Sequence, residues 1–338
     1  MRFTLSISII IISGIVLFIL NIAVGTVFIP IRNVIEILSG DGLSPESWTI
    51  IVKNSRLPQA LTALLAGSGL AVGGLQMQTL FRNPLADPTL IGVSSGAGLG
   101  VALVLMTSSF AGIVLSTTGF LGSLTITFAA FCGASISLFV ILFLAGRLKN
   151  NVMLLIAGIM IGYVASSLIS ILNFYGMKDD VHSFVIWGLG SFSAVSWEKM
   201  LFFCPALLIG LFFSFLLIKP LNVLLLGENY AQNLGINIKR TRFIILLVTG
   251  LLTSVVTSFC GPISFLGLAV PHLTKGVLRT SNHLKLVPSV MLSGASLALL
   301  CNLISRLPGF DGTLPINAVT GIIGAPIVIW LLAKRKIG

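Results

Sequence analysis

The chain has 338 residues, of which 56% are hydrophobic and only 9% are charged. Apolar runs of ~18 residues or more recur from one end to the other, and each can cross a bilayer core of ~30 Å, which excludes an ordinary water-soluble domain. The formal net charge of +11 does not indicate nucleic-acid binding, because the basic residues gather in the predicted inner loops, as the positive-inside rule expects.

Ten membrane spans are predicted in chain order, at residues 4–29, 57–80, 90–110, 120–145, 152–174, 199–219, 241–262, 264–279, 286–305 and 315–333. The first is interpreted as an uncleaved span rather than a signal peptide, because its apolar stretch is too long and lacks a clear cleavage site. The 264–279 span is the least regular, since Pro271 and Lys275 interrupt it. Short surface helices are expected within the outer segments 30–45 and 175–198.

The distribution of charge orients this topology. With both termini in the cytoplasm, the inner side holds most of the 20 basic residues and only two acids, Asp87 and Glu228. The outer side is then nearly balanced in charge, which is the asymmetry expected of a multi-pass membrane protein. We therefore predict a single all-α polytopic membrane domain over residues 1–338, surrounded by membrane lipid and without a nucleic-acid partner.

Glycine is abundant, at 35 residues, and some glycines have the four-residue spacing of close helix contacts. Small residues let helices approach in a membrane, where no hydrophobic effect drives them together. The pattern predicts helix contacts at Gly69 and Gly73, at Gly92, Gly96 and Gly100, and at Gly158 and Gly162.

A polar elbow, FRNPLADPTLIG at residues 81–92, separates the second and third spans. Pro84 and Pro88 exclude a continuous helix there, and irregular backbone at membrane depth is tolerated where it lines a cavity or is buried in protein. Residues 255–273 loosely repeat this order of helix, Gly/Pro break and further apolar run, five spans later. The two copies would run in opposite directions, as in the inverted repeats of transporters, although chance similarity is an equal alternative.

Catalytic chemistry is absent from the sequence. There is no Ser-His-Asp spacing, no zinc motif and no GxxxxGK[ST] nucleotide loop, so neither a metal nor a cofactor is expected and the chain is not interpreted as an enzyme. All nine acids fall in loops or at span ends, whereas ion-coupled transporters usually need ionisable groups at mid-membrane depth. Energy should come from a partner, with a passive pore or an autonomous secondary transporter as alternatives.

The inner loop of about 220–242 contains a candidate docking element. Its sequence predicts a short helix from about 227 to 234 that stops at Gly235. Ala231 and Gly235 would leave a shallow face suited to a partner's groove. An ordinary polar loop helix is the alternative interpretation.

Seven motifs together resemble the permease subunits of the iron-chelate, haem and vitamin B12 (FecCD-type) class of ATP-binding-cassette importers. They span essentially the whole chain: RLP at 56–58, RNPLADPTLIG at 82–92, GLGSF at 188–192, LGENYAQNLG at 226–235, GPISFLGLAVPH at 261–272, SGA at 293–295 and GIIGAP at 321–326. The resemblance implies a type II importer permease, a ten-helix bundle with an inverted pseudo-repeat in the cell inner membrane.

The same resemblance implies partners and cargo. The permease would act as a homodimer with two cytoplasmic ATPase subunits, which hydrolyse ATP, and a periplasmic substrate-binding protein. Its cargo would be an iron-siderophore, haem or a related metal chelate, with vitamin B12 as the alternative.

Three groups of residues match functional positions of the family. The resemblance implies a cytoplasmic gate at Asn83, Leu85, Asn151 and Val152. It implies ATPase coupling by Gly227, Glu228, Ala231, Leu234 and Gly235. It also implies docking of the binding protein at Arg56 and Arg306, which we expect to be exposed at outer helix ends.

Four positions depart from the usual family pattern. Gln59 replaces a second arginine after RLP, Lys275 replaces an arginine, Asn302 an aspartate and Thr313 a glutamate. The loss of acids near the outer ends of spans nine and ten predicts that Arg306 lacks a local carboxylate partner.

Overall fold

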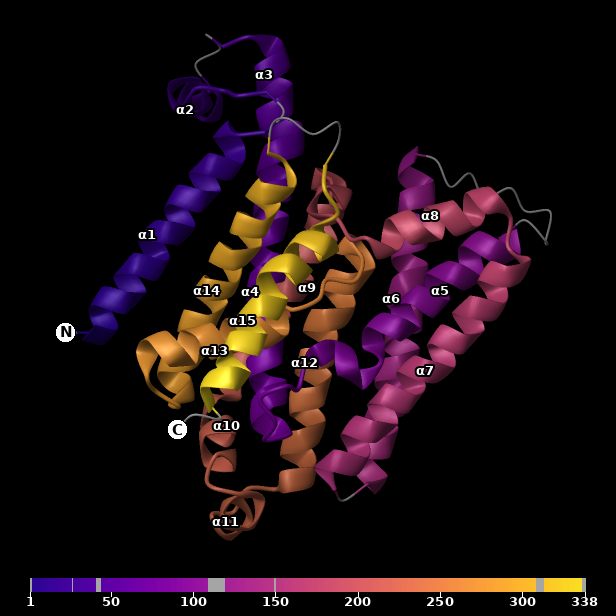
Figure 1. The fold of residues 1–338 in the computed structure, drawn as a ribbon, viewed down its shortest axis with the longest axis vertical. Helices are drawn as coiled ribbons and strands as arrows, with labels where there is room; N and C mark the ends of the chain where they lie inside the picture. The colour runs from indigo at the N-terminus through magenta and orange to yellow at the C-terminus, as the bar shows by residue number, and fades with distance from the viewer. Residues whose placement is uncertain are drawn as a thin grey trace.

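The computed structural model describes residues 2–25, 27–40, 44–108, 119–148, 150–307 and 313–335. Within these ranges all regular structure is helical. The long helices form a bundle (Figure 1), with α2 (Ile31–Ser39) and α3 (Glu46–Ile50) at one end and α11 (Glu228–Asn233) at the other. We call these the α2 end and the α11 end.

Each of the ten predicted spans coincides with a helix. In chain order these are α1 (Arg2–Ala23), α4 (Leu57–Leu80), α5 (Val93–Ser108), α6 (Gly119–Arg147), α7 (Asn151–Tyr175), α9 (Trp197–Leu216), α12 (Ile238–Cys260), α13 (Leu266–Leu278), α14 (His283–Ser305) and α15 (Ile316–Arg335). Among the described residues, seven helices are long and apolar enough to cross a membrane, whereas α5 and α13 have only 16 and 13 residues.

The predicted span at 264–279 is only half a span. Its helix α13 has 13 residues and is therefore ~20 Å long, less than the ~30 Å of a bilayer core. The chain before it is unwound, because Gly261 and Phe265 have φ values of +76° and +69°. These backbone conformations end the helical geometry on the N-terminal side of α13.

Shorter helices connect the spans. The predicted surface helices are present as α2 and α8 (Lys178–Gly188), although α2 buries Val34 and Ile37 while its other isoleucines face outward. The remaining short elements are the π-helix η1 (Ile51–Arg56), the 3₁₀-helices η2 (Pro88–Ile91) and η3 (Phe192–Ala194), and α10 (Ile218–Leu224).

Two helices form the centre of the bundle. In the apolar stretches of the spans containing α4 and α12, 83% and 72% of the residues are buried. In those of α1 and α7, only 11% and 17% are buried. α1 and α7 lie at opposite edges of the molecule (Figure 1). Their exposed residues are mostly apolar, which suits surfaces covered by lipid or by another membrane subunit.

Close helix crossings depend on particular glycines. A Cβ on Gly67 would lie 2.3 Å from the Gly294 carbonyl oxygen, and a Cβ on Gly74 would lie 1.8 Å from that of Gly267. The predicted contact at Gly96 is confirmed, because Gly96 packs directly on Gly133 of α6. Gly69 and Gly73, by contrast, face side chains and not backbone. A Cβ on Gly69 would lie 3.2 Å from its nearest neighbouring atom, and a Cβ on Gly73 would lie 3.4 Å from its own.

The two helix breaks pack against each other at the centre. The Gln78 amide of α4 donates to the carbonyls of Gly267 and Leu268 at 3.4 and 3.2 Å, and Asp87 Oδ2 lies beside Gly267. α4 descends from the α2 end while α12 rises from the α11 end (Figure 1). The elbow and the unwound segment before α13 are thus neighbours in oppositely directed halves of the bundle.

Candidate functional site

The elbow after α4 is a non-helical turn, as its prolines predict. Arg82 adopts a left-handed backbone with φ +49°, and the Asn83 carboxamide oxygen accepts a hydrogen bond from the Leu85 amide at 2.9 Å. His272 Nε2 lies 2.6 Å from the Pro84 carbonyl oxygen. The elbow is therefore a braced turn rather than a loose loop.

Asp87 closes the elbow as the N-cap of η2. Its carboxylate accepts hydrogen bonds from the amide and the hydroxyl of Thr89, at 2.8 and 2.6 Å. Burial raises the pKa of Asp87 above its ordinary value, while the two Thr89 hydrogen bonds act in the opposite direction. Asp87 thus stabilises the turn by capping, but its ionised form is costly at this buried site.

Near the elbow, at the α11 end, α11 is a short helix that ends as the sequence predicts. Gly235 has φ +84°. The Ile236 amide donates to the Ala231 carbonyl at 3.0 Å and the Gly235 amide to the Gln232 carbonyl at 3.0 Å. These two bonds form the Schellman motif that typically stops a helix at glycine.

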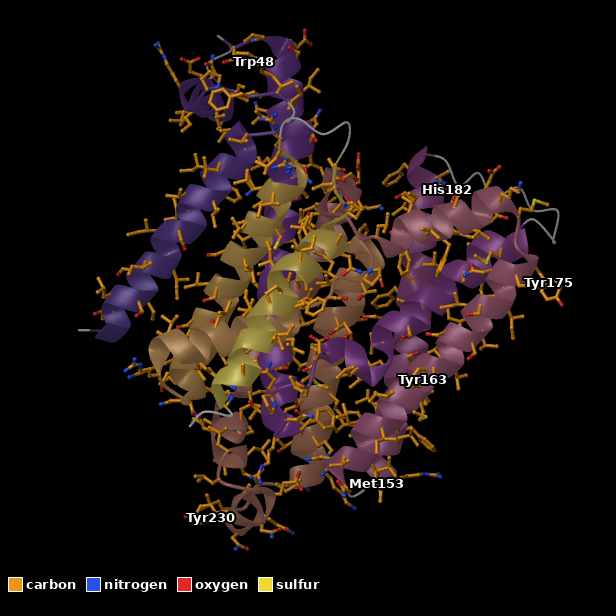
Figure 2. The ribbon with its side chains drawn as sticks, viewed as in Figure 1. Trp48, Met153, Tyr163, Tyr175, His182 and Tyr230 are labelled. Atoms are coloured by element: carbon orange, nitrogen blue, oxygen red, sulfur yellow. The ribbon has the colours of Figure 1, made fainter. Side chains whose placement is uncertain are left out.

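The face that α11 presents differs from the prediction. Ala231 is fully buried in the protein's own core, so the expected docking face at Ala231 is wrong. The exposed apolar side chains of the segment include Leu226, Tyr230 and Leu234, and Tyr230 lies at the tip of the α11 end (Figure 2). Tyr230 lies within α11, whereas Leu226 precedes its N-cap and Leu234 is its C-cap, so helical spacing in the sequence does not reveal this face.

Glu228 joins α11 to neighbouring helices. Its Oε1 accepts hydrogen bonds from Asn151 Nδ2 at 2.6 Å and from Arg242 Nη2 at 3.3 Å. Asn151 Nδ2 also donates to the Leu80 carbonyl at 3.0 Å, and Arg242 Nη1 donates to the Leu148 carbonyl at 3.0 Å. The Glu228 carboxylate therefore binds the start of α7 and the start of α12 directly, and Asn151 connects it to the end of α4.

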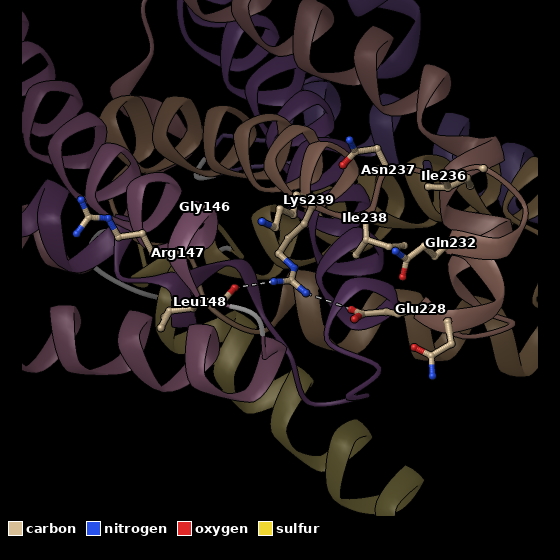
Figure 3. Close-up of a pocket in the computed structure, with 12 residues that line it drawn as sticks. Gly146, Arg147, Leu148, Glu228, Gln232, Ile236, Asn237, Ile238 and Lys239 are labelled. Carbon is tan, nitrogen blue, oxygen red and sulfur yellow. Dashed lines mark hydrogen bonds and ion pairs between the residues drawn. The ribbon is translucent and has the colours of Figure 1, made fainter.

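Two open grooves flank α11. One, of about 480 Å³, runs between α11, the end of α6 and the start of α12, and the Arg242 bonds to Glu228 and Leu148 cross it (Figure 3). The other, of about 820 Å³, is lined by the elbow, the start of α7 and residues 226–230. Two of the predicted gate residues, Asn151 and Val152, thus line the same groove as part of the predicted coupling segment.

The four predicted gate residues differ in exposure. Leu85 and Val152 expose apolar side chains. Asn83 and Asn151 are half-buried, and each has a hydrogen bond within the protein. The two asparagines therefore help to hold the segments that carry them, whereas the side chains of Leu85 and Val152 are free of such a role.

Arg56 and Arg306 are buried, so their expected exposure is wrong. Arg56 donates to the carbonyls of Ile22, Ala23 and Val27. Arg306 donates to the carbonyl of Asn21 at 2.7 Å. Both guanidinium groups therefore bind the backbone at the end of α1.

Two of the departures from the family pattern contact each other. Gln59 Nε2 donates to Asn302 Oδ1 at 3.0 Å, and Arg306 Nη1 donates to Gln59 Oε1 at 3.0 Å. Asn302 Nδ2 in turn donates to Asn21 Oδ1 at 2.8 Å. A neutral amide pair therefore supports Arg306, and Thr313 lies with this pair around a groove of about 300 Å³.

The titratable side chains form no other evident site. Within the described ranges, no group of three His, Cys, Asp or Glu residues is placed to hold a metal ion. The four cysteines are free thiols, and two of them, Cys260 and Cys301, are buried.

Known proteins match the chain along nearly its whole length. A sequence profile of the FecCD transport family matches residues 11–334. Vitamin B12 import system permease protein BtuC from Escherichia coli O127:H6 is 36% identical over 301 residues, 88% of each chain. The BtuC protein from Klebsiella pneumoniae subsp. pneumoniae is 33% identical over 317 residues, 92% of each chain.

A solved structure agrees with these relatives. It is described as an inward-facing conformation of a metal-chelate type ABC transporter, and it matches with a TM-score of 0.83 and 27% identity over 97% of this chain and 98% of that one. The fold and these comparisons define a multi-pass membrane permease of the ABC-transporter class. The chain belongs to the FecCD transport family.

Proposed function

We propose that the chain is the permease subunit of an ATP-driven importer of metal chelates in a bacterial inner membrane. The observation that carries this proposal is the family match over residues 11–334. The chain has no nucleotide-binding loop of its own, so ATP hydrolysis would come from two separate ATPase subunits. An autonomous secondary transporter is disfavoured because the spans lack a mid-membrane carboxylate.

The α11 end is the proposed site of ATPase coupling. Leu226, Tyr230 and Leu234 expose apolar side chains on and beside a short helix that ends in a Schellman motif. A short helix with exposed apolar residues suits a hydrophobic groove on a partner. Gly227, Glu228 and Gly235 would shape this helix and its attachments, while Ala231 packs it onto the permease.

The orientation follows from charge. Arg147, Lys239 and Arg240 lie at the α11 end together with Arg82 and Lys219. Basic residues favour the cytoplasmic side of a membrane. The α11 end would therefore face the cytoplasm, with both termini on that side.

A second copy of the chain would cover α7. This helix is 17% buried and exposes Tyr163, Ser167 and Ser170 at mid-span, with Tyr163 directed away from the bundle (Figure 2). Hydroxyl groups on an exposed helix face suit a water-filled pathway or a protein contact better than lipid. We propose a homodimer whose pathway runs along this face and narrows at Leu85 and Val152.

The substrate-binding protein would dock at the α2 end. Arg56 and Arg306 would shape this surface by holding the end of α1, rather than by facing acidic residues of the partner. For the cargo, the named relatives make a vitamin B12-type corrinoid the first compound to test. Iron-siderophores and haem are the other chelates of this transporter class.

Co-purification tests the coupling surface. The permease is expressed with its ATPase, and the expected result is a stable complex that Tyr230→Asp weakens at least tenfold, because a charge would be placed in an apolar contact. Asn33→Asp, at the opposite end of the molecule, is the control and should leave the complex intact. Failure of the unmodified chain to bind any ATPase would overturn the proposal.

A further inference from the structure

We infer that Glu228 and Asn151 form a latch that transmits movement of α11 to the inner gate. The inference rests on the proposed function, because α11 is the element that the ATPase would move. It concerns how two segments of this chain are joined, so it can be tested on the permease alone.

The first step is the geometry of the junction. One amide nitrogen, Asn151 Nδ2, lies 2.6 Å from Glu228 Oε1 and 3.0 Å from the Leu80 carbonyl oxygen. Asn151 is the first residue of α7 and Leu80 is the last of α4. A single amide group therefore holds α11, α7 and the helix that leads into the elbow.

The second step is where the latch lies on α7. Leu154 and Gly158 pack the helix onto the protein, and a Cβ on Gly158 would lie 2.8 Å from the Ile91 Cα of η2. Asn151 lies before these contacts, at the very start of the helix, next to Val152, one of the two exposed gate residues. The latch therefore acts on the first turn of α7, beyond the contacts that pack the helix onto the protein.

The third step is a parallel tie to the elbow. Arg82 Nη2 donates to the Leu224 carbonyl at 3.0 Å, and Gly227 lies so close that a Cβ there would be 3.1 Å from the same nitrogen. Residues 224–228 thus hold the elbow through Arg82 and α7 through Asn151. A displacement of this segment would move Leu85 and Val152 together.

The fourth step concerns the choice of glutamate. A hydrogen bond to a carboxylate is stronger than one to a neutral acceptor, so the Glu228 bond can transmit force. The Glu228 side chain is still 35% exposed and borders both grooves. A partner that seats on α11 can therefore shift it without first unfolding the permease.

Hydrogen exchange on the dimeric permease in nanodiscs tests the latch directly. Glu228→Ala and Asn151→Ala should each raise exchange of the α7 amides at residues 155–160 about tenfold, because each loses a charge-assisted bond. The effects of the two substitutions should be less than additive in the double variant, since both remove the bond between Asn151 and Glu228. Glu228→Gln should have a smaller effect, because its amide oxygen can still accept both bonds.

Gln232→Ala is the matched control. Gln232 lies one turn further along α11 and borders the same groove as Glu228, so its loss should leave α7 exchange unchanged. Unchanged exchange in both latch variants, or effects that simply add in the double variant, would overturn the inference.

The functional test uses proteoliposomes with the co-purified ATPase, the binding protein and cyanocobalamin. Both single variants should lose several-fold in cargo moved per ATP hydrolysed, whatever the rate of hydrolysis. If Glu228→Ala instead prevents ATPase binding while Asn151→Ala does not, Glu228 is an ATPase contact and the latch is wrong. If the unmodified chain neither binds an ATPase nor transports, the proposed function fails, and the exchange result still decides whether the latch exists.

Discussion

Two arginines far apart in the sequence cap the same helix end. The last carbonyl groups of an α-helix have no partner within the helix, and α1 has no basic residue in its last turn. Arg56 and Arg306 donate to backbone carbonyls there, and their charge faces the negative end of the helix dipole. These bonds add to the packing of Ile22 and Ala23, which are buried at the same end of an otherwise exposed helix.

This role makes a prediction about salt. Arg56→Ala should destabilise the permease by ~1.5–3 kcal/mol, since hydrogen bonds from a charged group are lost. The loss should be the same at ~0.1 M and ~1 M salt, because buried contacts are screened little. Thermal unfolding in detergent measures it, with Arg32→Ala as the control, since Arg32 is exposed and pairs only with Glu36. A defect that disappears at high salt would instead indicate a surface role.

Asp87 makes a prediction about pH. Its pKa is raised in the folded state, so the folded protein holds this proton more tightly than the unfolded chain does. The free energy of unfolding therefore falls as the pH rises and Asp87 ionises. Asp87→Asn keeps an oxygen to cap η2 without the charge, and should be at least as stable as the unmodified protein at about pH 8. This advantage should shrink as the pH falls and Asp87 becomes protonated. Unfolding temperatures measured from about pH 5 to pH 8 check the trend, and an advantage that grows in acid would contradict it.

At the scale of elements, the sequence predicts where helices start and stop better than which face they bury. The prolines of the elbow and Gly235 act through local backbone geometry, so their breaks are predictable. The burial of Ala231 and of Arg56 depends on elements distant in sequence, which the local spacing of residues does not encode. The apolar residues Leu226, Tyr230 and Leu234 are visible in the sequence, but their exposure follows from the way α11 packs on the protein.

Adjacent glycines provide a test of the central crossing. Gly74→Ala would place a Cβ 1.8 Å from the Gly267 carbonyl oxygen, whereas Gly73→Ala would place one 3.4 Å from the nearest atom, in the Pro88 ring. The first should cost ~1–3 kcal/mol or more, because backbones must separate, and the second should cost little. Thermal unfolding of the two variants compares them, and equal stability would show that α4 and α13 are not in backbone contact.

At the scale of the whole molecule, the two edge helices α1 and α7 leave most of their surface exposed. The sequence predicts its ten helices because apolar runs report membrane length, but it does not reveal that α13 is half a span. It also cannot show that α7 and α1 occupy opposite edges, with α7 bearing hydroxyl groups on its open side. These features follow from three-dimensional packing. Val152, one of the proposed gate residues, lies at the start of α7, the helix proposed to contact a second copy.

ATP-driven uptake into proteoliposomes tests the central claim most directly. The permease is reconstituted with its ATPase inside the vesicles and its binding protein outside, and labelled cyanocobalamin, a ferric siderophore and haem are supplied in turn. We predict that one of these chelates accumulates only when hydrolysable ATP is enclosed, and that dissipating the proton and sodium gradients has no effect. Accumulation that requires an ion gradient and proceeds without ATP would contradict the account.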